Sequence, residues 1–159
     1  MSDYPPLDPD FENRIRKSFQ RQSIMSTIGA ELALIQPGEV HINAPYDKRF
    51  IQQDGFLHAG TITTLIDSAC GYAAYSLMPA DSRVLSVEFK INLLSPAQGD
   101  SFRAEGRVIK PGKTLTVCDG KLFALNDEQE KLVAIMQATM ICVPAEKSRG
   151  FPAAVERSM

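Results

Sequence analysis

Residues 55–78 read GFLHAGTITTLIDSACGYAAYSLM, and this stretch decides the fold. Its apolar and alanine side chains recur every three or four residues, which predicts a helix of about 20 residues with one buried face. Pro79 is expected to end that helix. The buried face is expected to comprise Ala59, Ile62, Leu65, Ile66, Ala69 and Ala73. One acid, Asp67, interrupts the small and apolar run.

The residues after this helix predict antiparallel strands. In VLSVEFKIN, apolar residues at 85, 87, 89 and 91 alternate with polar ones, and SFRAEGRVI continues the same period of two. The turns SPAQGD, KPGK and NDEQEK separate four strand-like runs. The last run, LVAIMQATMICV, is apolar on both faces, which is typical of a strand inside a sheet.

Two elements precede the long helix. A short N-terminal helix is expected from Asp8 as N-cap and Pro9 in the first turn to a stop at Gly29. Its buried stripe would be Phe11, Ile15 and Phe19. A hairpin follows in AELALIQPGEVHINAP, turning at Pro-Gly. Residues 45–57 then form a long connection, and loops of this length are often functional.

The order of elements predicts the fold class. A helix, two strands, a long helix and four strands indicate an α+β protein in which a curved antiparallel sheet wraps around one long helix. We expect a single domain over residues 1–159, with loosely ordered termini at 1–8 and 144–159.

Composition excludes several function classes. The formal net charge of −2 gives no basic field that would attract nucleic acid. The sequence contains no run of about 20 apolar residues, so no membrane span is predicted. Three scattered cysteines and two histidines, without a C-x-x-C pair, predict neither a disulfide framework nor a metal site. The acidic, proline-rich start is unlike a signal peptide. We therefore expect a reduced, cytoplasmic protein without nucleic-acid or membrane partners.

Asp67 admits two interpretations. Small residues share its helical face, so a partner chain or a ligand could approach closely there. In the first interpretation this is a solvated side of the helix, where an aspartate is ordinary. In the second it is a partly desolvated carboxylate that acts as a base or nucleophile. The small residues on this face are Gly60, Thr63, Thr64, Gly71 and Ala74.

His58 stands at the start of the helix. The backbone N–H groups of residues 59–61 would point out of this end, together with the positive end of the helix dipole. Such a place can bind a carbonyl oxygen and stabilise an oxyanion, and Gly55 and Gly60 permit close approach of a substrate. The alternative is that His58 caps the helix or packs in a loop.

GRVIKPGKT, residues 106–114, has a superficial likeness to a phosphate-binding P-loop. Five residues separate its glycines where the motif needs four, and the next residues indicate a strand instead of a helix. We interpret it as a hairpin turn, whose Lys110 and Lys113 could still contact phosphates of another ligand.

Three linked elements resemble a known family. About residues 30–143 are similar to the hotdog-fold acyl-CoA thioesterases of the phenylacetate-degradation (PaaI-like) type. The segments that carry the similarity are GFLHAGTITTLIDSACGYAA, SVEFKINLLSPAQGD and VIKPGKTL. The shared signature is a G-x-x-H-G-G run, an acid nine residues after the histidine, and a strand that ends in an S-P turn. The resemblance implies hydrolysis of an acyl- or aryl-CoA to free acid and CoA, without a cofactor beyond the CoA of the substrate. It also implies a homo-oligomer, a dimer or a homotetramer built as a dimer of dimers, with the active site between two subunits.

The resemblance assigns roles to individual residues. Asp67 corresponds to the general base or nucleophile, and the backbone N–H of Ala59, directly after His58, to the donor that polarises the thioester carbonyl. Gln52 corresponds to a side-chain amide that places substrate or water, and Ser86 to a hydroxyl contributed across the interface.

The chain departs from the family pattern at two points. It has H-A-G in place of H-G-G, and Gln52 where asparagine is common, with Gln53 as a competing neighbour. Further expected substrate contacts are Gly60 and, for the CoA phosphates, Lys110, Lys113 and Arg83.

Three other functions remain open for such a fold. A hotdog dehydratase or hydratase would carry other local motifs, with proline- and glycine-rich surroundings that this chain lacks. A non-catalytic acyl-CoA-binding or regulatory module would have no use for a semi-buried Asp67. A purely structural assembly domain is the third.

Overall fold

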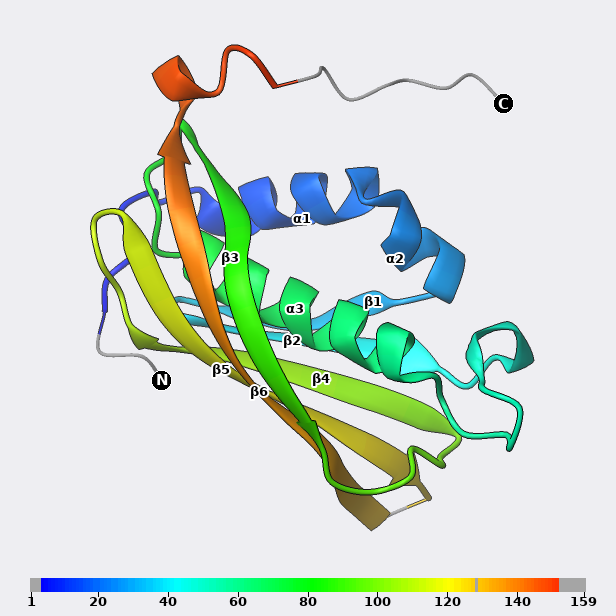
Figure 1. The fold of residues 1–159 in the computed structure, drawn as a ribbon. Coiled ribbons are helices and arrows are strands. Elements are labelled where there is room, and N and C mark those ends of the chain that lie inside the picture. Colours follow the sequence, from blue (N-terminus) through cyan, green and yellow to red (C-terminus); the bar gives the residue numbers. More distant parts are fainter. Residues whose placement is uncertain (1–3, 128, 152–159) are drawn as a thin grey trace.

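The computed structural model describes residues 4–127 and 129–151. Within them, six strands form one antiparallel sheet in the order β1-β2-β4-β5-β6-β3, which curls around the long helix α3 (Figure 1). The helices are α1 (Phe11–Arg21), α2 (Ser23–Ile28) and α3 (Ala59–Tyr75), with short 3-10 turns η1 (Lys48–Phe50) and η2 (Ala145–Lys147). The strands are β1 (Glu31–Gln36), β2 (Glu39–Pro45), β3 (Ser82–Leu93), β4 (Ser101–Lys110), β5 (Leu115–Asn126) and β6 (Gln129–Pro144).

The predicted hotdog fold is confirmed. Helix α3 has 17 residues and lies in the concave side of the sheet, with Leu65, Ile66 and Ala69 buried. It begins at Ala59, as the periodicity indicates, but Ala59 itself is exposed and does not belong to the buried face. The helix is shorter than predicted because it ends at Tyr75, before Pro79.

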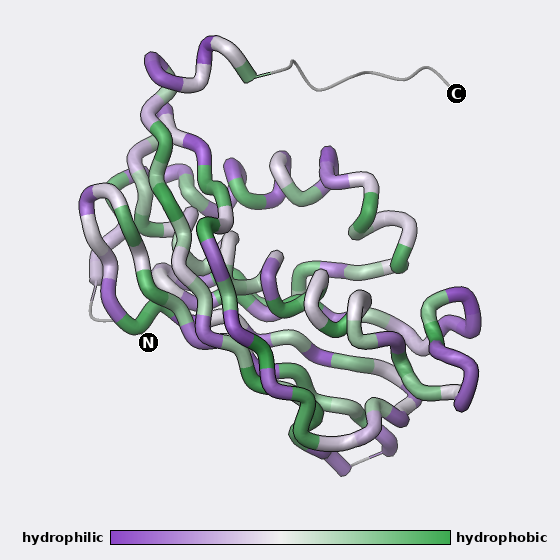
Figure 2. Tube along the Cα trace, in the orientation of Figure 1, coloured by the Kyte–Doolittle hydropathy of each residue, from purple (hydrophilic) through white to green (hydrophobic). Residues whose placement is uncertain are grey.

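The predicted strands are confirmed as well. β1 and β2 form the expected hairpin, and Gly38 in its turn has a φ of 74°, which a type II turn requires at its third residue. β6 lies between β5 and β3, in agreement with its apolar character on both faces. Hydrophilic and hydrophobic residues alternate along β3 (Figure 2).

The start of the N-terminal helix was predicted wrongly. Helix α1 begins at Phe11, so Asp8 is not its N-cap. Its carboxylate instead accepts the Asp10 N–H at 2.9 Å and pairs with Arg14 at 3.0 Å. The predicted helix is also interrupted at Gln22, whose ψ of 91° separates α1 from α2.

The buried stripe of α1 and its stop are confirmed. Ile15 and Phe19 are buried, Phe11 packs against the core, and α2 ends at Gly29 with a φ of 74°.

The described part of the C-terminal tail makes defined contacts. The Ala145 N–H donates to the Asp81 carbonyl at 2.8 Å, and the Arg83 guanidinium lies 5.4 Å from the Phe151 ring centre. Of the termini expected to be loose, residues 1–3 and 152–159 lie outside the described residues. The single-domain assignment, which spans them, stays a prediction.

Gly106 fixes the distance between the sheet and α3. A Cβ atom at this position would lie 2.3 Å from the Ala69 carbonyl carbon, which is backbone. We expect Gly106→Ala to lower the free energy of unfolding by about 1–3 kcal/mol, because helix or sheet must shift to admit the methyl group. Urea unfolding at fixed protein concentration measures this change. Gly150→Ala, with no neighbouring atom within 4 Å of its Cβ, is the control; equal stability of the two variants would contradict the prediction.

Candidate active site

Asp67 and Ser86 form a hydrogen-bonded pair. The Ser86 Oγ–H donates to Asp67 Oδ1 at 2.7 Å. Ser86 lies on β3 just before a bulge between Ser86 and Glu88, and this part of β3 runs beside α3. The expectation that Ser86 reaches Asp67 across an interface is therefore wrong, since both residues belong to one chain. The bond fixes one carboxylate oxygen and leaves the other available for chemistry.

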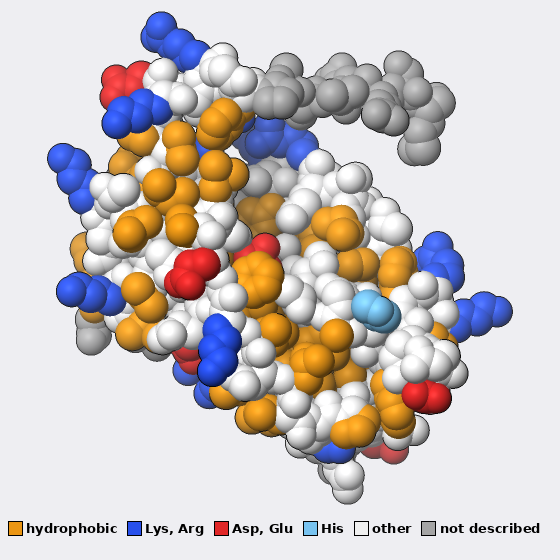
Figure 3. Space-filling model, viewed as in Figure 1, with side chains coloured by type: hydrophobic (Ala, Val, Ile, Leu, Met, Phe, Trp, Pro, Cys, Tyr) orange, Lys and Arg blue, Asp and Glu red, His pale blue; other side chains and the backbone are white. Residues whose placement is uncertain are grey.

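The pair opens into a pocket of about 550 Å³ between α1, α3 and β3. The surface of the molecule is hollowed in this region (Figure 3). Of the expected phosphate contacts, Arg83 also lines this pocket. Gln22 and Tyr72 line it too, and sequence reasoning missed both. The sequence carries no signal for either: Tyr72 lies five residues after Asp67, about 140° around the helix, and the position of Gln22 depends on how α1 packs.

His58 caps α3. Its Nδ1 accepts the Gly60 N–H at 2.9 Å, so the ring proton of a neutral imidazole is on Nε2. Its carbonyl accepts the N–H groups of Thr61 and Ile62 at 2.9 and 3.1 Å. Within residues 4–127 and 129–151, the Ala59 N–H has no acceptor, which leaves it as the free donor at the positive end of the helix.

The donor and the acid of one chain do not meet. Asp67 follows Ala59 by eight residues of continuous helix, a separation of about 12 Å along the axis. A carbonyl bound at the Ala59 N–H is therefore out of reach of the Asp67 carboxylate of the same chain.

Gln52 and Gln53 lie in the loop before α3, and both turn toward Asp54. Gln52 Oε1 accepts the Asp54 N–H, and its Nε2 donates to Asp54 Oδ2 at 3.4 Å. Gln53 Nε2 donates to the same oxygen at 3.3 Å. The loop is held near the start of α3 because the His58 N–H donates to the Phe50 carbonyl at 2.9 Å. Among residues 4–127 and 129–151, no hydrogen bond joins either glutamine to Asp67.

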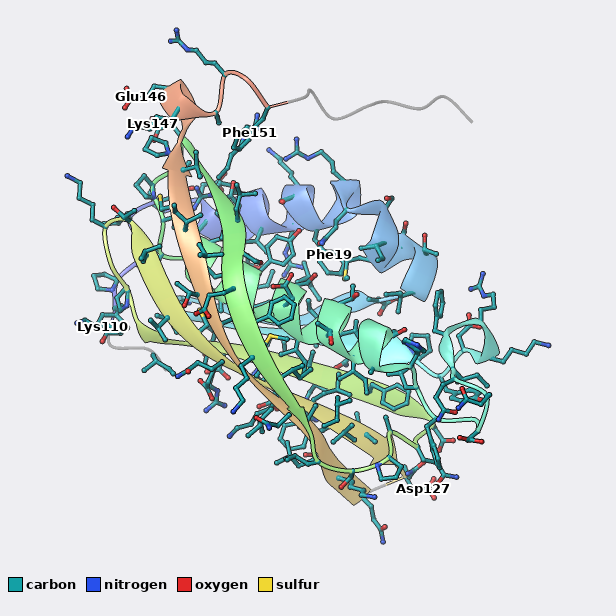
Figure 4. All side chains as sticks on the ribbon, in the orientation of Figure 1. Phe19, Lys110, Asp127, Glu146, Lys147 and Phe151 are labelled. Atoms are coloured by element: carbon teal, nitrogen blue, oxygen red, sulfur yellow. The ribbon has the colours of Figure 1, made fainter. Side chains whose placement is uncertain are left out.

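Lys110 and Lys113 lie elsewhere. They flank the β4–β5 turn, and Lys110 is at the opposite side of the molecule from the loop that precedes α3 (Figure 4). Neither lines the pocket that contains Asp67 and Arg83. The structure therefore does not bring these two lysines to the site.

The small-residue face of α3 is open over most of its length. Gly60 is exposed, and Gly71 is half-buried. The Thr63 and Thr64 hydroxyls donate to the carbonyls of residues 59 and 60 at 2.8 and 2.9 Å, which satisfies their polar atoms within the helix. Ala74 is the exception, since it is fully buried in the core. The open part can be approached closely by another chain.

The described residues contain neither a membrane-spanning helix nor a metal-binding cluster. No helix in residues 4–127 and 129–151 is long and apolar enough to cross a membrane. In the same residues, no three His, Cys, Asp or Glu side chains are grouped to hold a metal ion.

Known proteins share this sequence and fold. A family model described as the thioesterase superfamily matches residues 54–131, which include His58, Asp67 and Ser86. A candidate esterase of Saccharolobus solfataricus is 32% identical over 108 residues, an alignment that covers 64% of this chain and 76% of that protein. The chain belongs to the thioesterase superfamily. Its membership confirms the predicted enzyme class, thioester hydrolase.

Solved structures of thioesterases agree. A thioesterase family protein from Silicibacter pomeroyi is 46% identical with a TM-score of 0.83, over 84% of this chain and 98% of that one. A Staphylococcus aureus thioesterase is 25% identical with a TM-score of 0.71, over 77% of this chain and 100% of that one. The Escherichia coli PaaI protein shares the fold. It is 20% identical with a TM-score of 0.76, over 86% of this chain and 96% of that one.

Proposed function

We propose that this thioesterase hydrolyses acyl-CoA thioesters to free acid and CoA, with Asp67 as general base or nucleophile. The observation that carries the proposal is the Asp67–Ser86 pair, which opens into a pocket of about 550 Å³. A carboxylate with one oxygen fixed and one facing a cleft is arranged to activate water or to attack a carbonyl carbon.

The site is completed by a second copy of the chain in this proposal. The acid half is Asp67 and Ser86, and the donor half is the free Ala59 N–H about 12 Å away on the same helix. A second α3 packed antiparallel on the small-residue face would bring its Ala59 beside Asp67. The two-fold operation then produces two equivalent sites.

The edge strand β3 supports this dimer. β3 ends the sheet, and Val87, Phe89 and Leu93 on it are 53%, 44% and 52% exposed. Hydrophobic side chains gather over this side of the molecule (Figure 3). A long apolar edge strand is rare on an unpartnered surface, because it pairs readily with another strand.

A dimer of dimers would need a further apolar surface. Ile141 on β6 lies between two register partners, Leu85 on β3 and Leu115 on β5. Both leucines are largely exposed, at 45% and 49%. We propose this row on the outer face of the sheet as the contact between dimers.

The chemistry then proceeds in two stages. The thioester carbonyl oxygen accepts the Ala59 N–H of one chain while water, deprotonated by Asp67 of the other, attacks the carbonyl carbon and gives the free acid. In the alternative the carboxylate itself attacks, and water then hydrolyses the mixed anhydride on Asp67 to release the acid. The N–H and the positive end of α3 stabilise the resulting oxyanion. The C–S bond breaks, and CoA leaves as a thiolate whose conjugate thiol has a pKa near 8.5, so no strong acid is needed. Gln52 and Gly60 would border the carbonyl, and Arg83 would approach a CoA phosphate.

A thiol-release assay tests this proposal. Short, medium, long and aryl acyl-CoAs are incubated with the protein, and free CoA is followed with a thiol reagent. Turnover of at least one substrate at about 1 s⁻¹ or faster is expected. Burial raises the pKa of the Cys118 thiol to about 12 and that of Cys70 well above its ordinary value, so these protein thiols contribute little background. Binding of acyl-CoA without thiol release would instead support a non-catalytic module.

A further inference from the structure

Two arginines at the Asp67 pocket have no carboxylate partner. Arg21 at the end of α1 and Arg83 on β3 both line this pocket and are exposed, so they lie where it meets solvent. Among residues 4–127 and 129–151, neither forms an ion pair or donates a hydrogen bond. Their N–H donors are therefore available to an anionic ligand. The arginines that pair with a carboxylate, at 2.6 to 3.0 Å, are Arg14, Arg16, Arg49, Arg103 and Arg107.

The position of Arg83 suits a phosphate that belongs to a long ligand. Arg83 lies three residues before Ser86 on β3, which is about 10 Å along the strand. An anion held by Arg83 is therefore well away from Asp67, whose Oδ1 accepts the Ser86 hydroxyl. CoA has this arrangement, because its pantetheine arm separates the sulfur from the phosphate groups.

The ring of Phe151 lies against the Arg83 guanidinium. The Arg83 Cζ is over the ring, 5.4 Å from its centre. Contact with the face of an aromatic ring attracts the guanidinium but takes none of its N–H donors, which lie in the guanidinium plane. The ring therefore holds the Arg83 side chain in one place and leaves its donors free.

The segment that carries Phe151 is fixed beside the start of β3 (Figure 4). The Ala145 N–H donates to the Asp81 carbonyl at 2.8 Å. Ser148, which is 5% exposed, donates its N–H and its hydroxyl to the Ala145 carbonyl at 3.1 and 2.9 Å. The Phe151 N–H then donates to the Ser148 carbonyl at 3.0 Å. This segment lies beyond residues 54–131, which the family model matches, so family membership does not imply its role.

We propose that Arg21 and Arg83 bind a phosphate group of CoA where the pocket meets solvent, and that Phe151 positions Arg83 for this contact. The inference rests on the proposed thioesterase function and deepens it. A guanidinium that is already held against a ring loses less conformational freedom when the phosphate binds. Removal of the ring should therefore weaken the binding of CoA and leave the chemical step unchanged.

Matched substrates test the inference. One acyl group is presented as its CoA thioester and as its pantetheine thioester, which has no phosphate, and kcat and KM are measured for both. Arg83→Gln and Arg21→Gln should each raise KM for acyl-CoA about three- to tenfold, because charge-assisted hydrogen bonds are lost. Phe151→Leu should raise it about two- to fivefold. In all three variants kcat, and KM for acyl-pantetheine, should stay within about twofold of wild type.

Two further variants separate stacking from packing. Phe151→Tyr keeps the aromatic face and should keep KM within about twofold of wild type, whereas Phe151→Leu keeps similar bulk without that face. Phe123→Leu is the matched control. It removes the same kind of contact elsewhere, since the Phe123 ring centre is 5.2 Å from the Arg103 guanidinium and neither residue lines the Asp67 pocket. This control should change neither KM.

Two results would overturn the inference. One is an Arg83→Gln variant with an unchanged KM for acyl-CoA. The other is a Phe151→Leu variant whose KM changes equally on both substrates or on neither, because a residue that positions Arg83 for a phosphate affects only the substrate that has one.

A binding experiment separates this failure from failure of the proposed function. CoA and pantetheine are titrated calorimetrically into the wild-type, Arg83→Gln and Phe151→Leu proteins. Weaker binding of CoA by the same factors, with pantetheine unaffected, supports the assignment even if no thiol is released in the first assay. Equal CoA affinity of the three proteins contradicts it whatever the catalytic result. Inorganic phosphate is titrated as well. If it binds wild-type protein as tightly as CoA does, the ligand is a free anion and the assignment to CoA is wrong.

Discussion

Replacing Asp67 by asparagine is expected to lower kcat about 10³-fold for the best acyl-CoA substrate, with little change in stability. The amide has the shape of the carboxylate, and its oxygen can still accept the Ser86 hydroxyl that now lies 2.7 Å from Oδ1. It can neither take a proton from water nor attack the thioester. Steady-state thiol release and urea unfolding of the same preparation separate the two effects.

Two variants calibrate this prediction. Ser86→Ala removes the hydrogen bond but leaves the carboxylate, so we expect a smaller loss of about 10- to 100-fold in kcat. Asp100→Asn removes an exposed carboxylate in the β3–β4 connection and should keep wild-type activity. Full activity in Asp67→Asn would contradict the assigned role, and an equal loss in Asp100→Asn would indicate a general effect of charge.

Ala59→Pro is expected to remove most of the activity without breaking α3. Ala59 is the first residue of the helix, where proline is well tolerated because its missing N–H has no intrahelical partner. His58 has φ −63° and ψ 140°, the extended conformation that a residue before proline prefers. The substitution removes the proposed oxyanion donor, which we expect to cost about 10²–10³-fold in kcat. Circular dichroism should show unchanged helix content.

Mixing two inactive variants tests whether the site is shared. If Ala59 of one chain faces Asp67 of the other, a mixed dimer of Ala59→Pro and Asp67→Asn chains contains one site with both wild-type groups. Random subunit exchange should then restore about a quarter of wild-type activity, because half of the dimers are mixed and half of their sites are intact.

The matched control is a mixture of Asp67→Asn and Ser86→Ala. Both residues belong to the same half of the site, as their 2.7 Å contact within one chain shows, so this mixture should recover nothing beyond the residual activity of its members. Recovery in the control alone would place Ser86 opposite Asp67 across the interface. Recovery in neither mixture, with exchange demonstrated by mass-tagged subunits, would contradict the shared site.

The sequence predicted those parts of the fold in which local pattern and final burial agree. The three- and four-residue spacing around Ile66 placed α3, and the alternation in VLSVEFKIN placed β3. The N-terminal helix was predicted less well. Asp8 has the residue type of an N-cap, but it lies outside the helix, where it forms an ion pair with Arg14. The helix breaks at Gln22, although no glycine or proline at this position predicts a break. Both outcomes depend on packing against α3, which local propensity does not contain.

The site was predicted in the same uneven way. Asp67 and Ser86 were each identified as candidate site residues. Their contact within one chain was not predicted, because the 18 residues between them do not show how β3 aligns along α3. The role of Ala59 as a free N–H follows from the N-cap bond of His58, one of two alternatives that the sequence left open. The roles assigned to these residues stay predictions that the variants above examine.

The sequence by itself determined the strands, the long helix, their order and the one acid on the small-residue face of that helix, because periodicity and residue type are local properties. The sequence also contains the family signature, because that signature is defined by the number of residues between its members along the chain. Only the tertiary structure decided which side chains meet: Ser86 with Asp67, Tyr72 with Gln22, and neither lysine of the β4–β5 turn with the pocket. The physical reason is that the curvature of the sheet and the docking of α1 set these distances, and both result from burial summed over the whole core.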